Sequence, residues 1–272
     1  MKKFLLLILV LLLGVEAAYA HGTGFLTKLN ITEDEYGKML IEERKNVGWQ
    51  LLREKRGSEE SSFEFYDSLV EMELGLQRGD IDEIIVPDMV ANYILNVNKA
   101  FAFGSVEKVR PVSLACGFNK RDEALRDKFN QALISMKEDG TLLKIVSTYL
   151  ATPGLDEPTP VKIDRFDKAN TLIVAVTGDM PPVDFVDEGG RPAGFNMAVM
   201  AEIGRRLKMN LAFANVNAGT RAAALVSRRV NAVFWYFDVK YLEKNIDVPD
   251  GVILSEPYYE FDKFIHIKLR DK

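Results

Sequence analysis

Residues 171–196 read TLIVAVTGDMPPVDFVDEGGRPAGFN and combine a strand, a rigid loop, a turn and a helix start. Leu172 to Val176 is a short apolar run rich in β-branched residues, which predicts a buried strand. The proline pair favours an extended turn, because proline fixes φ and keeps the preceding residue out of the helical region. Asn196 is predicted to be the N-cap of a helix. Asp179 therefore follows a strand's carboxyl end, where ligands bind in open α/β sheets.

This order of elements resembles the first lobe of the family 3 solute-binding proteins, the periplasmic receptors of polar amino-acid ABC transporters. That lobe opens with a strand, the pattern G-[DE]-x-P-P-[FY]-x-[FY], an acidic glycine turn and G-F-[DN] before a helix. The matching residues are Gly178-Asp179, Pro181-Pro182, Phe185, Asp187 to Gly190 and Gly194 to Asn196. The resemblance implies a type II periplasmic-binding-protein-like α/β fold, in which two α/β lobes joined by a hinge close on a small solute.

A second match lies earlier in the chain and resembles the second lobe of the same family. From the residues alone, Phe63 to Tyr66 predicts a strand, Asp67-Ser68 the cap of a helix that ends at Gly79, and Ile81 to Val86 a buried strand. The likeness continues to Leu150, with a strand that recrosses the hinge and C-terminal helices, the last capped by Thr141. Before this match, residues 21–52 have helical character and a capping box that begins at Thr32.

The two lobes occur in the opposite order from that of the family, which predicts a circular permutation. The ends of such folds lie near each other at the surface, so a new order of the same elements is physically plausible. A piece of a tandem array of receptors is the alternative. We expect a signal peptide at 1–20, a lobe 2-like α/β domain with an extra N-terminal helical region at 21–118, C-terminal-type helices packing on lobe 1 at 119–150, a linker at 151–170, and a lobe 1-like α/β domain ending in a hinge strand at 171–272.

The N-terminus and the composition indicate an exported protein. Lys2-Lys3, an apolar run and Ala18-Tyr-Ala20 form a secretory signal pattern, so we expect a cleaved peptide and a periplasmic protein. The net charge of −5 is spread over interspersed acidic and basic residues, which gives no nucleic-acid surface. Cys116 is the only cysteine, which excludes an intrachain disulfide, and its apolar neighbours predict a buried thiol.

The predicted interlobe cleft departs from the family at its main contacts. The family holds an amino acid through a lobe 1 Arg within T-x-x-R and a lobe 2 Asp. Here the first region reads Asp238-Val-Lys-Tyr-Leu-Glu-Lys244, without Arg, and the second position is Pro87, one residue before Asp88. Lys240 or Lys244 could substitute only as a point charge. An ordinary α-amino-acid ligand is therefore less expected than the fold alone implies.

The candidate ligand-binding residues follow from this comparison: Asp179, Phe185, Trp235, Tyr236, Phe237, Asp238, Asp88 and Ser58. The aromatic residues 235–237 could stack on a less polar ligand, while the aspartates accept hydrogen bonds from its donor groups. Alternatively, Trp235 and Phe237 point into a hydrophobic core from alternate positions of a strand. Ser58 lies in a polar loop that resembles a ligand-touching turn of the second lobe only weakly, and a plain surface loop is the alternative.

We therefore predict a monomeric receptor for a small polar or aromatic, amino-acid-like solute, working with an ABC permease or a membrane sensor. No catalytic or cofactor motif is present, and the two histidines have no metal-site spacing. Two alternatives remain: an enzyme similar to periplasmic cyclohexadienyl dehydratases, and a degenerate interaction module that binds no ligand.

Overall fold

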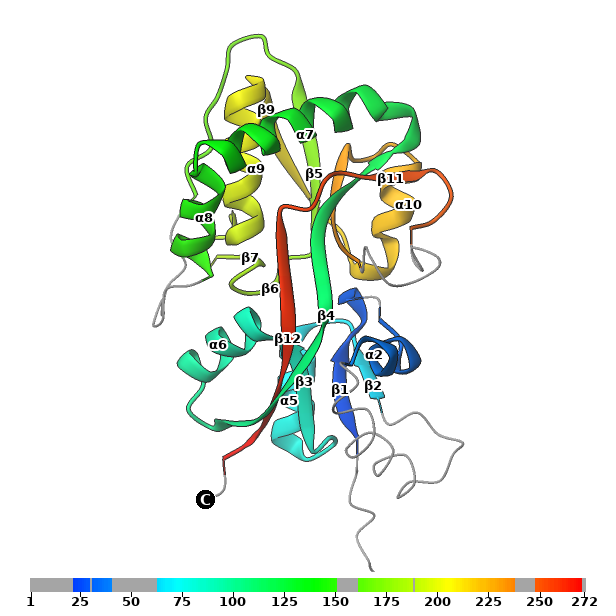
Figure 1. Cartoon of the computed structure of the whole chain (residues 1–272), viewed down its shortest axis with the longest axis vertical. Helices are drawn as coiled ribbons and strands as arrows, with labels where there is room; N and C mark the ends of the chain where they lie inside the picture. The colour runs from blue at the N-terminus through cyan, green and yellow to red at the C-terminus, as the bar shows by residue number, and fades with distance from the viewer. Residues whose placement is uncertain are drawn as a thin grey trace, which may run out of the picture.

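The computed structural model describes residues 22–29, 31–40, 63–150, 161–187, 189–237 and 248–270. These residues form two α/β lobes, upper and lower in Figure 1, joined by the long strands β4 (Phe101–Asn119) and β12 (Tyr259–Leu269). A nine-stranded sheet runs through both lobes in the order β2-β1-β3-β12-β4-β10-β5-β9, with β11 paired to β4. The predicted α/β class with two lobes and a hinge is confirmed.

The lower lobe has a parallel sheet covered by short helices. Its elements are β1 (Thr23–Leu26), η1 (Thr27–Leu29), α2 (Glu33–Met39), β2 (Phe63–Tyr66), α5 (Leu69–Arg78), β3 (Glu83–Pro87) and α6 (Asp88–Val97). The prediction of helical character from residue 21 is wrong at Thr23–Leu26, because this segment pairs in parallel with β2 and β3 and buries all four residues. Its partner strands β2 and β3 lie about 40 and 60 residues further along the chain, so no local sequence pattern predicts the pairing.

Local capping signals in the lower lobe are confirmed. Thr32 and Glu35 form the capping box of α2, and the Ser68 hydroxyl accepts from the backbone N–H of Glu71 at the start of α5. Gly79 ends α5 with φ 79°, a left-handed conformation that suits glycine. Each cap satisfies backbone groups that a helix end leaves unpaired.

The upper lobe has a second parallel sheet with a small antiparallel sheet beside it. Its elements are η3 (Lys120–Asp122), α7 (Glu123–Glu138), α8 (Thr141–Tyr149), β5 (Thr171–Val176), β6 (Asp179–Met180), β7 (Asp184–Val186), β8 (Pro192–Ala193), α9 (Phe195–Leu207), β9 (Asn210–Asn215), η4 (Ala218–Thr220), α10 (Arg221–Val226), β10 (Ala232–Phe237) and β11 (Val252–Leu254). The predicted Thr141 cap is wrong, since Gly140 is the N-cap and Thr141 is already helical. Its hydroxyl accepts from Arg206 of α9 instead.

The two lobes share one strand plan. A central strand, β1 below and β5 above, lies between two parallel neighbours. The next strand is antiparallel and comes from the other lobe: β12 beside β3, and β4 beside β10. Residues 76–86 and 225–235, which align without gaps in the sequence, occupy equivalent helix–strand positions in the two lobes. The sheet of each lobe therefore includes a strand that crosses the hinge from the other lobe: β12 in the lower lobe and β4 in the upper lobe.

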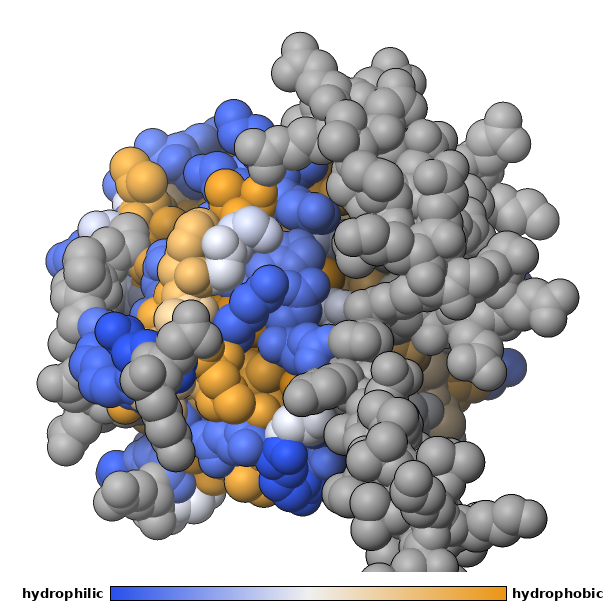
Figure 2. Space-filling view, turned by 90° about the horizontal axis from the view of Figure 1, so that it is seen from below, coloured by the Kyte–Doolittle hydropathy of each residue, from blue (hydrophilic) through white to orange (hydrophobic). Residues whose placement is uncertain are grey.

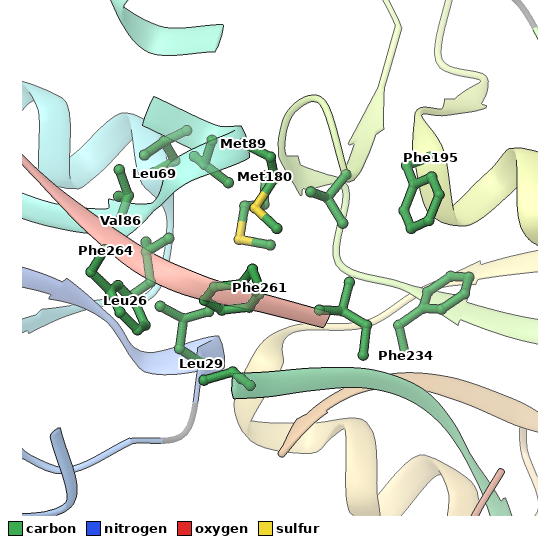
Figure 3. Close-up of a cluster of buried hydrophobic side chains, with 14 of the residues drawn as sticks. Leu26, Leu29, Leu69, Val86, Met89, Met180, Phe195, Phe234, Phe261 and Phe264 are labelled. Atoms are coloured by element: carbon green, nitrogen blue, oxygen red, sulfur yellow. The ribbon is translucent and has the colours of Figure 1, made fainter. Parts of the chain in front are cut away.

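One continuous hydrophobic core extends from one lobe to the other. Met180 of β6 is fully buried, and Leu29 of η1 and Met89 of α6 are 1% and 3% exposed. These side chains belong to the same cluster as Phe261 of the hinge strand β12 and Phe195 of α9 (Figure 3). The lobes thus meet through apolar side chains.

The lower end of the molecule carries both apolar and polar side chains on the part of its surface that the structure describes. Hydrophobic and hydrophilic residues alternate over this face (Figure 2). Exposed apolar side chains of this kind are normal when they are scattered. None of the described helices has both the length and the apolar character needed to cross a membrane.

Candidate functional site

A small, partly open pocket lies in the upper lobe near the carboxyl ends of the parallel strands β5 and β9. It is lined by Ala175, Thr177, Asp184, Asn196, Val216, Arg221, Val233 and Phe234. The carboxyl edge of a parallel sheet is the usual ligand position in α/β folds. This pocket, which we call the upper-lobe pocket, is therefore the candidate site.

A buried cation and a buried anion line the upper-lobe pocket. Arg221, the first residue of α10, is 5% exposed, and Asp184 of β7 is 4% exposed. The Asp184 carboxylate accepts from the backbone N–H of Thr177 at 3.1 Å, from the Thr177 hydroxyl at 2.8 Å and from Gly178 N–H at 3.4 Å. The loop after β5 thereby stabilises the carboxylate, as a buried charge requires.

Asn196 brings an amide into the same pocket. The predicted N-cap role is wrong, because α9 begins one residue earlier, after an N-cap at Gly194. Its Oδ1 accepts from the Tyr258 hydroxyl at 2.9 Å, while its buried Nδ2 has no hydrogen-bond partner among the described residues. A buried donor without a partner costs about 1–3 kcal/mol. A ligand oxygen at this point would satisfy it.

Gly194 is the N-cap of α9, and its backbone conformation sets the position of Asn196 in the first turn. We expect Gly194→Ala to destabilise the protein by about 2 kcal/mol or more. Its φ is 96°, and a Cβ there would lie 2.6 Å from the Pro182 oxygen and 2.9 Å from the Val183 oxygen. Those oxygens accept from the backbone N–H groups of Phe195 and Asn196, so they cannot withdraw without loss. Urea unfolding measures the effect.

Gly219→Ala is the matched control, because a Cβ at Gly219 would meet nothing within 4 Å. We expect its stability to stay within about 0.5 kcal/mol of the parent protein. Equal stabilities for the two variants would contradict a structural requirement for glycine at position 194.

The structure places several predicted site residues beside one another in the upper lobe. Asp179 pairs with Phe185 across the small antiparallel sheet, and the Phe185 side chain is 8% exposed. The backbone of residues 235–237 ends β10, opposite 113–115 of β4. Ser58 and Asp238 lie outside the described residues.

Asp88 lies in the lower lobe, as the first residue of α6 after β3. Its Oδ1 accepts from the backbone N–H of Met89 at 2.9 Å, and burial raises the pKa of its carboxyl. Burial and the charges of Asp88 and Asp262 raise the pKa of Tyr259 to about 12, which places Asp88 near the hinge strand β12. Neither Asp88 nor Phe185 lines the upper-lobe pocket.

Sequence reasoning missed Arg221 and Asp184 as pocket residues. Both precede or follow small or apolar residues: Arg221 opens the run RAAALV, and Asp184 stands between Val183 and Phe185. A single charged residue among small or apolar neighbours was the sequence signal that could have identified Arg221 and Asp184 as pocket residues.

The two lobes also touch on either side of the hinge strands. β6 contacts α5, and η1 contacts both η4 and β10. The carboxyl ends of the upper-lobe and lower-lobe strands therefore face each other in a closed arrangement. A solute held by the upper-lobe pocket would lie near this contact.

Residues 172–245 match the family model of the bacterial extracellular solute-binding proteins, family 3. The predicted resemblance is confirmed for this part of the chain. A search of curated proteins finds no match.

Two similar solved structures are both binding components. The periplasmic aliphatic sulphonate binding protein SsuA of Escherichia coli is 13% identical, with a TM-score of 0.44, and the match covers 93% of this chain and 66% of that one. The ligand binding component of an ABC-type import system from Staphylococcus aureus, solved with zinc bound, is 8% identical, with a TM-score of 0.45 and coverages of 92% and 65%. The chain spans a little under two thirds of the length of both.

Proposed function

We propose that this chain captures a small solute between its lobes, as the match of residues 172–245 to the model of the bacterial extracellular solute-binding proteins, family 3, suggests. The solute is polar or aromatic and amino-acid-like, and an ABC permease or a membrane sensor receives the loaded protein. The observation that carries the proposal is the upper-lobe pocket at the carboxyl edge of a parallel sheet, where the buried Arg221 lies with the Asn196 amide, whose nitrogen has no partner among the described residues. Export through a signal peptide at 1–20 and action in the periplasm are parts of the proposal.

Capture would occur by hinge closure. The strands β4 and β12 join the lobes, and small backbone changes in two such strands let lobes open and close as rigid bodies. In this proposal the residues at 235–237, with Asp179 and Asp238, contact the solute from the upper lobe, and Asp88 and Ser58 contact it from the lower lobe.

We also propose that the chain is a circular permutation of the family's order. The shared strand plan supports it, because each lobe contains the full set of strands and takes its antiparallel strand from the other. The end of β12 and the start of β1 lie in the same lower lobe (Figure 1), so a covalent link there would restore the family's order.

A thermal-shift screen of residues 21–272 against amino acids, aromatic acids, small peptides, sugars and polyamines tests the proposed function. A ligand at about a hundred times its dissociation constant adds roughly 2.7 kcal/mol to the stability of the folded state, which should raise Tm visibly. We expect a saturable shift confined to one chemical class. A folded protein, freed of carried-over ligand, that shifts with no member of the panel would contradict solute capture.

The apolar interlobe contact favours a second candidate, an interaction module that binds no solute. Leu29, Met89 and Met180 fill part of the region between the lobes with buried apolar atoms. In that case the screen would show no shift, and changes at Tyr236 and Asp88 would leave every phenotype unchanged. Formation of phenylpyruvate from prephenate would instead favour the dehydratase alternative.

A further inference from the structure

We propose that Met89 and Met180 form an oxidation-sensitive contact between the lobes, and that a peroxide which oxidises them holds the molecule open. The two residues come from different lobes: Met89 belongs to α6 of the lower lobe and Met180 to β6 of the upper lobe. The proposal needs the lobes to separate about the hinge strands but needs no solute, so it goes beyond the proposed function.

The two methionine side chains point toward each other across the region between the lobes (Figure 3). Met180 is fully buried and Met89 is 3% exposed. Both belong to the hydrophobic cluster that contains Leu69 of α5 and Phe261 of β12, and β6 contacts α5. Each sulfur is thus buried among side chains of both lobes, so separation of the lobes brings it into water.

Oxidation makes this apolar contact polar. A peroxide transfers one oxygen atom to the thioether sulfur: an S–O bond forms, the O–O bond breaks, the sulfur is oxidised by two electrons, and hydrogen peroxide is reduced to water. The sulfoxide oxygen is a hydrogen-bond acceptor, which is costly to bury without a donor. The side chains of Leu69 and Phe261 carry no donor, so the oxidised lobes are expected to stay apart.

The position of the two sulfurs links their oxidation to lobe opening. Separation of the lobes about β4 and β12 exposes them without unfolding either sheet. Methionines buried inside one lobe have no such route to solvent. Met72 of α5 lies against Gly24 of β1, where an added Cβ would come 2.9 Å from Met72 Cγ, and Met136 is buried in α7 of the upper lobe. Both are 0% exposed, so they match Met180 in burial but differ from it in place.

Peroxide titration of the purified protein, followed by mass spectrometry of its peptides, tests this link. Met89 and Met180 should form sulfoxide at least about 10-fold faster than Met72 and Met136, because opening between lobes is less costly than unfolding a lobe. All four side chains are 3% exposed or less, so static burial predicts no such difference. Equal rates at the four sulfurs would overturn the proposal.

Small-angle scattering and circular dichroism measure the consequence of oxidation. The radius of gyration should rise with sulfoxide at Met89 and Met180 while the far-ultraviolet spectrum is kept, and methionine sulfoxide reductase should reverse the change. The double variant Met89→Leu, Met180→Leu keeps the apolar volume without sulfur, so it should stay compact at the same peroxide concentration. The matched control Met72→Leu, Met136→Leu should open as the parent protein does.

Two results would overturn the switch. One is a parent protein that carries both sulfoxides and keeps its radius of gyration. The other is a Met89→Leu, Met180→Leu variant that expands in peroxide as much as the parent protein. If circular dichroism shows that this variant does not fold, the order of oxidation in the parent protein decides, because that measurement needs no substitution.

Discussion

Replacing His266 by Leu is expected to lower the free energy of unfolding by about 3–5 kcal/mol. His266 lies in the hinge strand β12 and is 7% exposed. Its Nδ1 is 3.0 Å from Oε1 of Glu83 on β3, and its Nε2 is 3.7 Å from Oε1 of Glu107 on β4. The histidine thus lies between two carboxylates on the strands that flank β12. Leucine removes the positive charge and leaves the two carboxylates facing each other in a poorly solvated place.

The pH dependence of stability identifies the charge of His266 as the cause. Burial alone would lower its pKa, but Glu107 and Glu83 together raise the pKa to about 9. Because the unfolded chain has a histidine pKa near 6.5, this stabilisation is complete below about pH 6.5 and is lost as the pH rises through 9. Urea unfolding of the parent protein should therefore lose about 3 kcal/mol over that range, and His266→Leu should not show this component.

Two further variants distinguish an ion pair from simple packing. Lys268 Nζ is 3.4 Å from Oε2 of Glu83, but its side chain is 56% exposed, so Lys268→Met should cost less than about 1 kcal/mol. Adding Glu107→Gln to His266→Leu should recover part of the loss, because one of the two facing charges is removed. A double variant no more stable than His266→Leu would refute the electrostatic account. Tyr36, whose hydroxyl donates to Glu107 Oε2 at 2.9 Å, is unchanged in all of these variants.

Features of the fold that depend on neighbouring residues were predictable. The strand predicted from Leu172 to Val176, the Ser68 cap and the glycine end of α5 each follow from a few adjacent side chains, and all are confirmed. The buried thiol of Cys116 is also confirmed, and burial raises the pKa of this group. Apolar β-branched runs, caps and left-handed glycines act within one turn or strand, so sequence reasoning detects them.

Features that depend on partners far along the chain were not predictable. Thr23–Leu26 is a strand because β2 and β3 lie on either side of it, and the sequence around it contains no strand signal strong enough to show this. The Asn196 side chain does not cap the helix as predicted; its Oδ1 accepts from the hydroxyl of Tyr258, 62 residues away in sequence. Arg221 is buried in a pocket that is also lined by Ala175 of β5 and by Val233 and Phe234 of β10. The upper-lobe pocket therefore depends on contacts between separate segments of the upper lobe, which no local sequence pattern shows.

Replacing Met180 by Asp is expected to open the molecule rather than unfold it. Met180 is fully buried in β6, which contacts α5 of the lower lobe, and it belongs to the interlobe cluster with Leu69 and Met89 (Figure 3). An unpaired carboxylate in this position costs several kcal/mol while the lobes are closed. Separation of the lobes about β4 and β12 returns the charge to water and keeps both sheets, so it is the less costly response.

Small-angle scattering and circular dichroism of the Met180→Asp variant measure that response. The radius of gyration should increase while the far-ultraviolet spectrum stays that of the parent protein. If only about 1% of the molecules remain closed, the affinity for the solute should fall about 100-fold, because apparent affinity scales with the competent fraction. Leu143→Asp is the control, since Leu143 on α8 is 73% exposed and its charge would remain in water. An unchanged radius would show that Met180 does not hold the lobes together. Loss of the spectrum would show that the lobes share one cooperative core without hinge opening, which would also count against capture by closure.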